Sequence, residues 1–339
     1  MVIRMPWKLR RAIDWVRANK KGCVESILSV FKKPEYKYKI IISSAFFGGV
    51  GGIEKLLMTL VESLPNAIFY IYARELRAKG FVPEGSNYRV NWPVKSGSEF
   101  DMYLYFPGGG RPEYLGDKYR FRHSIIDTCG ANIKDIEDKF DWVAIQTGNA
   151  NRYSNAPEKW LFAFPNIPLT FPKILQPVDL PEHYYLTVFN PYSDKLKGGD
   201  EVAMAADAAC LPIVWCMSDK TGLKYNSDIS HDNVIKLVNL TQEQLYYVYR
   251  NADAYISFSH SEGLGWSIAE AFYCNLQIIT RDVGFVTYVK DQESVHLYDS
   301  IDELKALVSA KPYSLKSEND LRVLESGYFE KVIGNILAD

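Results

Sequence analysis

Two glutamates with seven residues between them, Glu262 and Glu270, are the strongest candidates for chemistry in this sequence. Glu262 stands in a glycine-bearing loop, SEGLG, and Glu270 lies within the apolar run WSIAEAFY, where we expect a helix that begins near Trp266. A carboxylate buried in such a run needs a hydrogen-bonding partner, because burying an unpaired charge is unfavourable. Sugar hydroxyls would supply that partner. Alternatively, Glu270 is an ordinary carboxylate near a helix N-terminus, which the helix dipole stabilises.

Two further loops combine glycines with the start of an expected helix. In FFGGVGGIEK the glycines include Gly51 and Gly52, and in DKLKGGDE the lysines Lys195 and Lys197 precede a glycine pair. Glycine lets the backbone approach a ligand, and both a helix N-terminus and a lysine ammonium attract phosphate. Neither loop has the GxGxxG spacing or the GK[ST] ending of the common phosphate-binding motifs. A plain tight turn and a solvated lysine loop remain the alternatives.

Short apolar runs that alternate with helical stretches must position these loops. Most runs are apolar throughout, which is typical of strands covered on both faces and predicts doubly wound parallel sheets of the α/β class. We expect strands at Lys39–Ser44, Ala67–Ala73, Tyr88–Trp92, Asp101–Phe106, His123–Thr128 and Trp142–Thr147, and then at Tyr184–Phe189, Pro212–Met217, Val234–Leu240, Ala254–Phe258, Gln277–Thr280 and Val295–Tyr298.

A proline-rich segment separates the two groups of strands. Five prolines fall between Pro165 and Pro181, which disfavours both helix and central strand and predicts an interdomain linker. The expected domains are therefore an extension of residues 1–37, a first Rossmann-like domain of residues 38–170 and a second of residues 171–318. A C-terminal helix of residues 319–339 could cross back to the first domain. Ligands of such sheets bind beyond the carboxyl ends of the strands, so the site is expected in a cleft between the domains.

The N-terminal segment differs from the rest of the chain in charge. The net charge of the protein is −2, yet residues 1–39 carry eleven Lys and Arg against three acids, with Trp7 and Trp15 among them. Apolar residues there recur at helical spacing, which predicts a basic amphipathic helical segment. It would either bind an anionic membrane surface or pack on the first domain. The chain offers no basic face typical of nucleic-acid binding, and its five scattered cysteines favour a reducing compartment, so we expect a cytoplasmic protein that is soluble or peripheral to the membrane.

A family resemblance connects these observations. The block SEGLGWSIAEAFYCNLQII resembles the EGfG-lp-lEAma-G-PVI signature of retaining glycosyltransferase family 4, the glycosyl transferases group 1, whose members have the GT-B fold of two Rossmann-like domains facing a central cleft. Four weaker matches occur in the family's order, so that the resemblance covers roughly residues 39–310: GGIEK, FPNIPLTFP, LKGGDEVAMAADA and LTQEQLYYVYRNADAYISFS.

The resemblance implies roles for individual residues. Lys197 would contact the donor phosphates, with Lys195 as a second positive charge, Glu270 would hold the ribose hydroxyls, and Glu262 would approach the transferred sugar. Backbone amides would complete the donor cradle at Gly263, Leu264 and Gly265, with Gly51 and Gly52 across the cleft. Glu262 and Lys197 are accordingly the expected catalytic residues. The resemblance implies no metal and no other cofactor.

Three departures from the family pattern affect the acceptor side most. Asn190 stands near the place of a usual arginine, Ile167 replaces a glycine after PN, and Asp127 to Cys129 stand where many members have a histidine.

The expected function is metal-independent, retaining transfer of a hexosyl- or pentosyl-type sugar from a nucleotide-diphospho-sugar to a glycan or lipid-linked acceptor. The transfer would belong to polysaccharide, glycolipid or glycoprotein glycan synthesis. The alternatives are a catalytically silent GT-B module and another sugar-nucleotide enzyme such as an epimerase.

Overall fold

A computed structural model describes the chain over residues 35–47, 52–76, 87–107, 111–128, 131–146, 150–163, 171–190, 194–218, 230–310, 319–320 and 328–338. The chain divides into two compact units, residues 1–37 and residues 38–339. Apart from residues 35–37, the expected basic extension lies outside the described residues, so its helical character stays a prediction.

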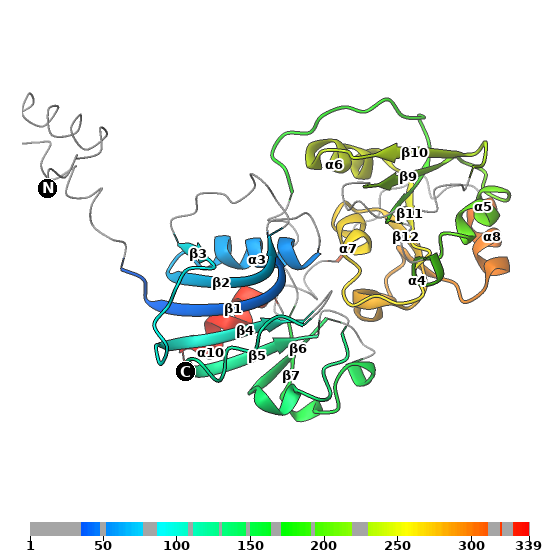
Figure 1. The fold of residues 1–339 in the computed structure, drawn as a ribbon. Helices are drawn as coiled ribbons and strands as arrows, with labels where there is room; N and C mark the ends of the chain where they lie inside the picture. The colour runs from blue at the N-terminus through cyan, green and yellow to red at the C-terminus, as the bar shows by residue number, and fades with distance from the viewer. Residues whose placement is uncertain are drawn as a thin grey trace, which may run out of the picture. The chain divides into compact units, whose positions relative to one another are not determined.

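The first sheet has seven parallel strands in the order β3-β2-β1-β4-β5-β6-β7 (Figure 1). Helix α3 (Gly52–Ser63) connects β1 to β2. The strand order reverses at β1, and ligands of such sheets bind at the carboxyl ends of the strands beside this reversal. The strands are β1 (Tyr38–Phe47), β2 (Ala67–Leu76), β3 (Tyr88–Val90), β4 (Glu99–Phe106), β5 (Arg120–Asp127), β6 (Trp142–Ile145) and β7 (Trp160–Phe162).

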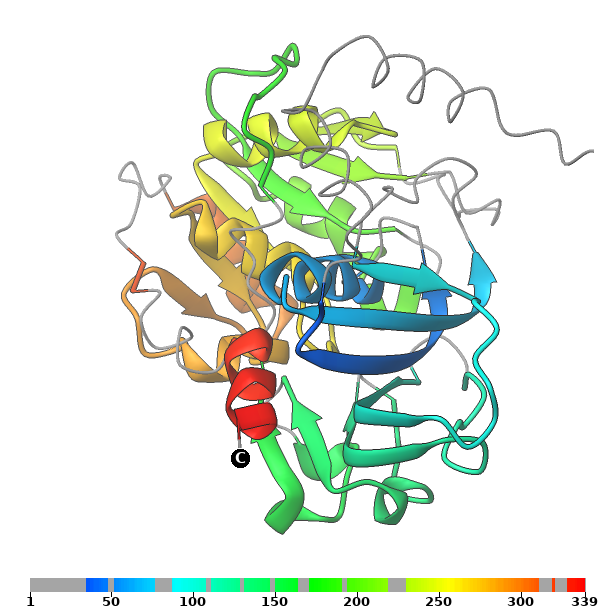
Figure 2. The same cartoon turned by 90° about the vertical axis from the view of Figure 1, so that its left-hand side faces the viewer.

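Successive side chains along the strands of the first sheet pack into two different hydrophobic cores. Ile40 and Ile42 share a buried cluster with side chains of α3 and of the C-terminal helix α10 (Phe329–Ala338), so both helices cover the same face (Figures 1 and 2). Ile41 and Tyr103 point to the other face and pack with residues of the connecting loops. Short 3-10 helices lie among these connections: η1 (Glu137–Lys139), η2 (Ala150–Arg152) and η3 (Pro157–Lys159).

The second sheet has six parallel strands in the order β10-β9-β8-β11-β12-β13. Its strand order reverses at β8, beside β11. The strands are β8 (Tyr185–Val188), β9 (Ile213–Met217), β10 (Val234–Val238), β11 (Ala254–Ile256), β12 (Gln277–Thr280) and β13 (Val295–Leu297). The helices are α4 (Asp194–Lys197), α5 (Glu201–Ala206), α6 (Gln242–Asn251), α7 (Trp266–Tyr273), the 3-10 helix η6 (Gly284–Tyr288) and α8 (Ile301–Ser309).

Helices cover both faces of the second sheet. Leu186 of β8 packs in a cluster with α6 and α7, whereas its neighbour Tyr185 packs in a cluster with α5 and α8. Thr241 and Ser300 begin α6 and α8 with reciprocal capping boxes, which satisfy backbone N–H groups that would otherwise lack partners. This arrangement is doubly wound, as the uniformly apolar strands predicted.

The predicted fold class is confirmed, and every predicted strand is present with small shifts at its ends. The last strand of the first sheet, β7, was not predicted, because Trp160–Phe162 is a very short segment beside the proline-rich region. Residues 164–170 of the expected linker lie outside the described residues, and residues 171–184 form no helix or strand. The division near residue 170 stays a prediction.

Candidate active site

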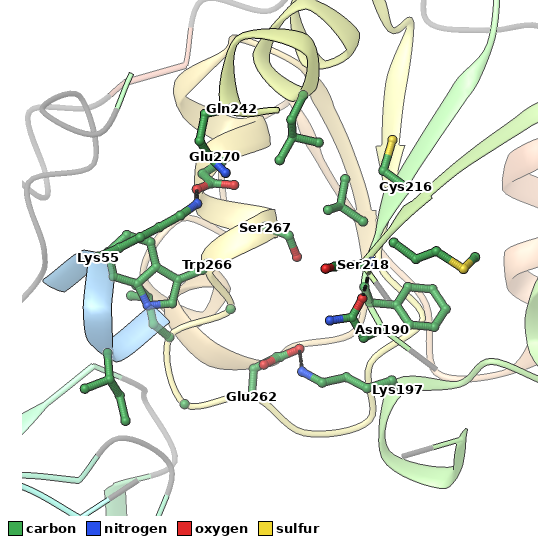
Figure 3. Close-up of a pocket in the computed structure, with 18 of the residues that line it drawn as sticks. Lys55, Asn190, Lys197, Cys216, Ser218, Gln242, Glu262, Trp266, Ser267 and Glu270 are labelled. Atoms are coloured by element: carbon green, nitrogen blue, oxygen red, sulfur yellow. Dashed lines mark hydrogen bonds and ion pairs between the residues drawn. The ribbon is translucent and has the colours of Figure 1, made fainter. Parts of the chain in front are cut away.

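A cavity of about 510 Å³ contains most of the side chains that the sequence singled out (Figure 3). Its lining comes from α3 and the end of β6 on the first sheet, and from the segments that follow β8, β9, β10 and β11 on the second. Glu262, Glu270, Lys197 and the loop of residues 263–265 all line it. The cavity therefore lies at the carboxyl ends of the strands, where a ligand of these sheets is expected.

The loop between β11 and α7 depends on a glycine for its shape. Gly265 precedes the first residue of α7 with φ of 82°, in the left-handed region that other residues rarely adopt. Gly263, Leu264 and Gly265 line the cavity together with Trp266 and Ser267, the first two residues of the helix. The N-terminus of α7 is thus part of the cavity wall, and such a terminus carries N–H groups that suit an anion.

Lys197, the last residue of α4, forms an ion pair with Glu262 of the loop that follows β11. Their segments follow β8 and β11, between which the strand order reverses. The Lys197 Nζ atom lies 2.5 Å from Glu262 Oε1, and the side chains are 25% and 15% exposed. Gly198, which follows Lys197, lets the backbone pass close to the segment after β11. Its φ is 64°, and a Cβ there would lie 2.4 Å from the Phe258 carbonyl oxygen. The structure therefore brings the two expected catalytic residues together.

Glu270 is buried and has two partners from other helices. Lys55 of α3 donates to Glu270 Oε1, and the Tyr249 hydroxyl of α6 donates to Oε2 at 3.3 Å. Glu270 is the fifth residue of α7, and the first turn of that helix contains no acid. The alternative of a carboxylate stabilised at a helix N-terminus is therefore wrong. Burial, and then the Glu270 charge, raise the pKa of Tyr249 well above its usual value, so this tyrosine stays a hydrogen-bond donor.

One wall of the cavity is apolar. Val188, Phe189, Cys216, Leu240 and Leu245 contribute to it, from the ends of β8 and β9 and from α6 and the residues before it. Burial raises the pKa of the Cys216 thiol to about 12, so it behaves as a small apolar group rather than as a nucleophile. A flat ring of a ligand could be desolvated against this wall.

A few polar groups interrupt the apolar wall. Asn190 Oδ1 accepts a hydrogen bond of 2.7 Å from the Ser218 backbone N–H, which fixes its amide at the end of β8. Ser267 Oγ accepts one of 2.8 Å from the Tyr255 hydroxyl. Gln242, the first residue of α6, also lines the cavity. Fixed polar groups beside apolar side chains can orient a small ligand in such a cavity.

A cluster of charged side chains outside the cavity lining connects two of its loops. Arg281 Nη2 donates to both carboxylate oxygens of Glu201, at 2.8 and 2.9 Å, and Nη1 donates to the Phe258 carbonyl oxygen at 2.9 Å. His260 Nε2 lies 2.9 Å from Glu201 Oε1, and the His260 backbone N–H donates to the Leu196 carbonyl oxygen. This cluster connects the Lys197 loop to the Glu262 loop and fixes their separation.

The first sheet adds two polar contacts near the cavity. Gln146, after β6, lines the cavity and donates through Nε2 to Asp127 Oδ2 at 2.7 Å. Asp127 is completely buried, so the acid near the position of the family histidine is held by Gln146 and does not line the cavity. Arg152 Nη1 donates to Ser261 Oγ at 3.0 Å, beside Glu262.

Some expected site residues lie outside the described part of the chain. Gly51 is one of them, and Gly52 is the first residue of α3. The backbone of Lys195 belongs to α4, but its side chain lies outside the described residues. Lys55 and Tyr249 line or support the site without having been predicted. Lys55 belongs to the GGIEK motif, but nothing in the local pattern indicates that its partner lies 215 residues away.

The described residues lack two features of other proteins. They contain no cluster of three or more His, Cys, Asp or Glu side chains that could hold a metal ion. None of their helices is long and apolar enough to cross a membrane.

Three solved structures share the fold at low sequence identity. The apo form of the lipopolysaccharide outer core galactosyltransferase WaaB is 13% identical, with a TM-score of 0.58 over 88% of this chain and 99% of its own. HepE of Anabaena, in complex with UDP and glucose, is 12% identical, with a TM-score of 0.55 over 89% and 99%. A trehalose-6-phosphate synthase, studied for glycosyl transfer with retention, is 9% identical, with a TM-score of 0.58 over 89% and 99%. Identities this low establish the fold alone.

Sequence comparison locates the family signature in the second sheet. Residues 228–310 match the glycosyl transferases group 1, a range that includes both glutamates and the whole of α7. No curated protein matches the chain in sequence. This family match supports glycosyl transfer as the activity. The resemblance drawn from the sequence is confirmed: residues 228–310 match the glycosyl transferases group 1, within a chain that has the GT-B fold.

Proposed function

We propose that the protein transfers a sugar from a nucleotide-diphospho-sugar to an acceptor hydroxyl, with retention of configuration and without a metal. One observation carries the proposal: both glutamates of the family signature line one cavity at the carboxyl ends of the strands, and each is paired with a lysine. Figure 3 shows the pairs at separate corners of the cavity, with Ser267 between them. In such a donor the ribose and the transferred sugar lie on either side of the diphosphate, so it needs polar groups at two such places.

The donor would lie along the wall of the second sheet. Its base would pack on the apolar side chains after β8 and β9, and its ribose hydroxyls would donate to the Glu270 carboxylate. Lys197 and the N-terminus of α7 would face the diphosphate, because an ammonium and unpaired N–H groups both favour phosphate. Glu262, held by Lys197 at 2.5 Å, would contact the transferred sugar. Complex formation with UDP and glucose in HepE of Anabaena supports this class of donor.

Retention follows if the acceptor attacks from the face that the nucleotide leaves. The bond from the anomeric carbon to the phosphate oxygen breaks, the acceptor oxygen forms the new bond on the same face, and the departing phosphate oxygen takes the acceptor proton. No protein nucleophile is then needed. Lys197 and the N–H groups of α7 would stabilise the charge that develops on the leaving diphosphate, which is the task of a metal in many other transferases. The structural likeness to a trehalose-6-phosphate synthase studied for retention supports this choice.

A binding screen tests the proposal first. UDP-, GDP-, ADP- and CDP-sugars are added in a thermal-shift assay, where a ligand at 100 times its Kd stabilises the folded state by about 2.7 kcal/mol. The donor that binds is then incubated with glycan and lipid-linked acceptors in the presence of EDTA, and the anomeric configuration of the product is read by NMR. Retention and activity in EDTA support the proposal. Tight binding with no nucleotide release would instead identify a catalytically silent module, and inversion would refute the mechanism.

We also propose that residues 1–37 hold the enzyme on an anionic membrane surface, at the cytoplasmic face, near a lipid-linked acceptor. The proposal rests on the excess of basic residues in this segment and on Trp7 and Trp15. Each basic residue near such a surface contributes about 1 kcal/mol to the free energy of membrane binding. The full chain should co-sediment with anionic liposomes at low salt and be released at high salt. Residues 36–339 alone should stay in the supernatant, and equal behaviour of the two proteins would refute the membrane proposal.

A further inference from the structure

The pairing of Lys55 with Glu270 connects a helix that packs on the first sheet to a helix that packs on the second. Lys55 belongs to α3, and Glu270 belongs to α7. The Lys55 side chain is 16% exposed and that of Glu270 is 3% exposed. The ammonium also lies 5.9 Å from the centre of the Trp266 ring, a distance typical of a cation–π contact. Lys55 is therefore held in the cavity by two groups of α7 (Figure 3).

The charges of the cavity balance in two pairs. Among the described residues that line it, those with ionised side chains are Lys55, Lys197, Glu262 and Glu270. Lys197 pairs with Glu262, and Lys55 pairs with Glu270. Asn190, at the end of β8, adds a neutral amide whose oxygen accepts from the backbone of Ser218. Among the charged side chains of this lining, the two lysines are therefore the ones that can pair with an entering anion.

The next step rests on the proposed function. A nucleotide-diphospho-sugar brings two negative charges and a ribose whose hydroxyls would donate to Glu270. Those hydroxyls take the place that Lys55 holds on the carboxylate. An ammonium that loses its counter-ion in a largely buried place is destabilised. The diphosphate is joined to the ribose, so its nearer phosphate is the closest anion of the donor, and the long flexible lysine side chain can turn to it.

We propose that Lys55 is a donor-binding residue, which exchanges the Glu270 carboxylate for the ribose-side phosphate when the donor binds. With and without donor, the Lys55 ammonium then has an anionic partner and the Glu270 carboxylate accepts hydrogen bonds. It also gives the first sheet a direct contact with the donor. Lys55 then favours nucleotides with phosphate over nucleosides without it, because a nucleoside displaces the lysine from Glu270 and offers it no new anion.

The experiment compares the binding of nucleosides and their diphosphates by calorimetry. Uridine, guanosine, adenosine and cytidine are titrated into the full chain beside UDP, GDP, ADP and CDP. In Lys55→Met the affinity for the diphosphate should fall at least about tenfold, while the affinity for the matching nucleoside should stay equal or rise. The ratio of the two affinities is the readout, and a residue that merely supports the fold would lower both affinities alike.

Three variants complete the test. Lys55→Arg keeps the charge, so its ratio of diphosphate to nucleoside affinity should stay close to that of the parent. Lys55→Gln keeps a hydrogen-bond donor for Glu270 without the charge, and it should lower the ratio of diphosphate to nucleoside affinity as Lys55→Met does. It can therefore replace Lys55→Met if that variant fails to fold. Lys118→Met removes an exposed lysine that pairs with Glu113, outside the cavity, and should change nothing.

Each outcome decides between the two proposals. A ratio unchanged in Lys55→Met and Lys55→Gln, with diphosphate binding intact in the parent, overturns the role of Lys55 and leaves the proposed function standing. An equal loss of nucleoside and diphosphate binding also overturns that role. A parent protein that binds none of the four diphosphates overturns the proposed function and the role of Lys55 together.

Discussion

Glu270→Gln is the sharpest single test of the donor site, because it removes one charge while keeping the shape of the side chain. Glu270 accepts from Lys55 and from Tyr249, and its side chain is 3% exposed. The amide oxygen of glutamine can still accept a hydrogen bond, but more weakly than a carboxylate. We expect the variant to bind a ribonucleoside diphosphate less tightly and to discriminate ribose from 2′-deoxyribose less strongly than the parent does.

The magnitude follows from the geometry of the pair. A hydrogen bond to a charged group contributes about 1.5–3 kcal/mol and one to a neutral group about 0.5–1.5 kcal/mol. The difference of about 1–1.5 kcal/mol predicts that donor affinity falls about 5- to 13-fold for each ribose hydrogen bond. Stability should fall as well, because Lys55 loses its counter-ion. Breaking a fully buried ion pair costs about 3–5 kcal/mol. Lys55 retains 16% exposure and the Trp266 ring at 5.9 Å, so we expect a smaller loss of about 1–2 kcal/mol in the free energy of unfolding.

Calorimetry with a ribonucleoside diphosphate and its 2′-deoxy form measures the affinity, and thermal melting measures the stability. UDP, GDP, ADP and CDP are each compared with their deoxy forms in the parent and in the variant. Glu113→Gln is the control, since Glu113 is an exposed glutamate that also pairs with a lysine. If Glu270→Gln discriminates ribose from deoxyribose as well as the parent does, Glu270 does not hold the ribose hydroxyls and the assignment is refuted.

Three further predictions concern the loops of the second sheet. Lys197→Ala should weaken donor binding more than Lys195→Ala in calorimetry, and the reverse order would transfer the phosphate role to Lys195. Glu262→Gln should lower the turnover number about tenfold or more while changing donor affinity less, because its proposed contact is to the sugar; an unchanged turnover number removes it from the site. Gly198→Ala should cost about 1–3 kcal/mol of stability and weaken donor binding, since its φ is 64° and the added Cβ would lie 2.4 Å from a carbonyl oxygen. Gly334→Ala is the matched control, because no atom lies within 4 Å of its added Cβ, and a melting temperature of Gly198→Ala equal to that of this control would contradict the prediction.

The sequence determined the strands and the loops that follow them. A strand such as Ile40–Ile42, buried on both faces, must be apolar at consecutive positions, and this pattern is visible locally. Loop glycines are visible for a similar reason, because Gly198 and Gly265 adopt backbone conformations that other residues avoid. Chain order and parallel connections then predict that Lys197 and Glu262, which follow β8 and β11, meet at one edge of the sheet.

Only the tertiary structure decided which charged groups face each other across the cavity. Lys55 looks in sequence like any lysine on an amphipathic helix, and for Glu270 the local pattern leaves open whether it is a buried carboxylate with a partner or an ordinary carboxylate near a helix start. Their pairing depends on how α3 and α7 come together, and 215 residues separate them along the chain. Likewise, Glu201, His260 and Arg281 come from three separate segments, yet their side chains are in contact. Local patterns report burial and backbone conformation, because those act through near neighbours in sequence. The partner of a charge depends on side chains brought together by folding, which no short stretch of sequence contains.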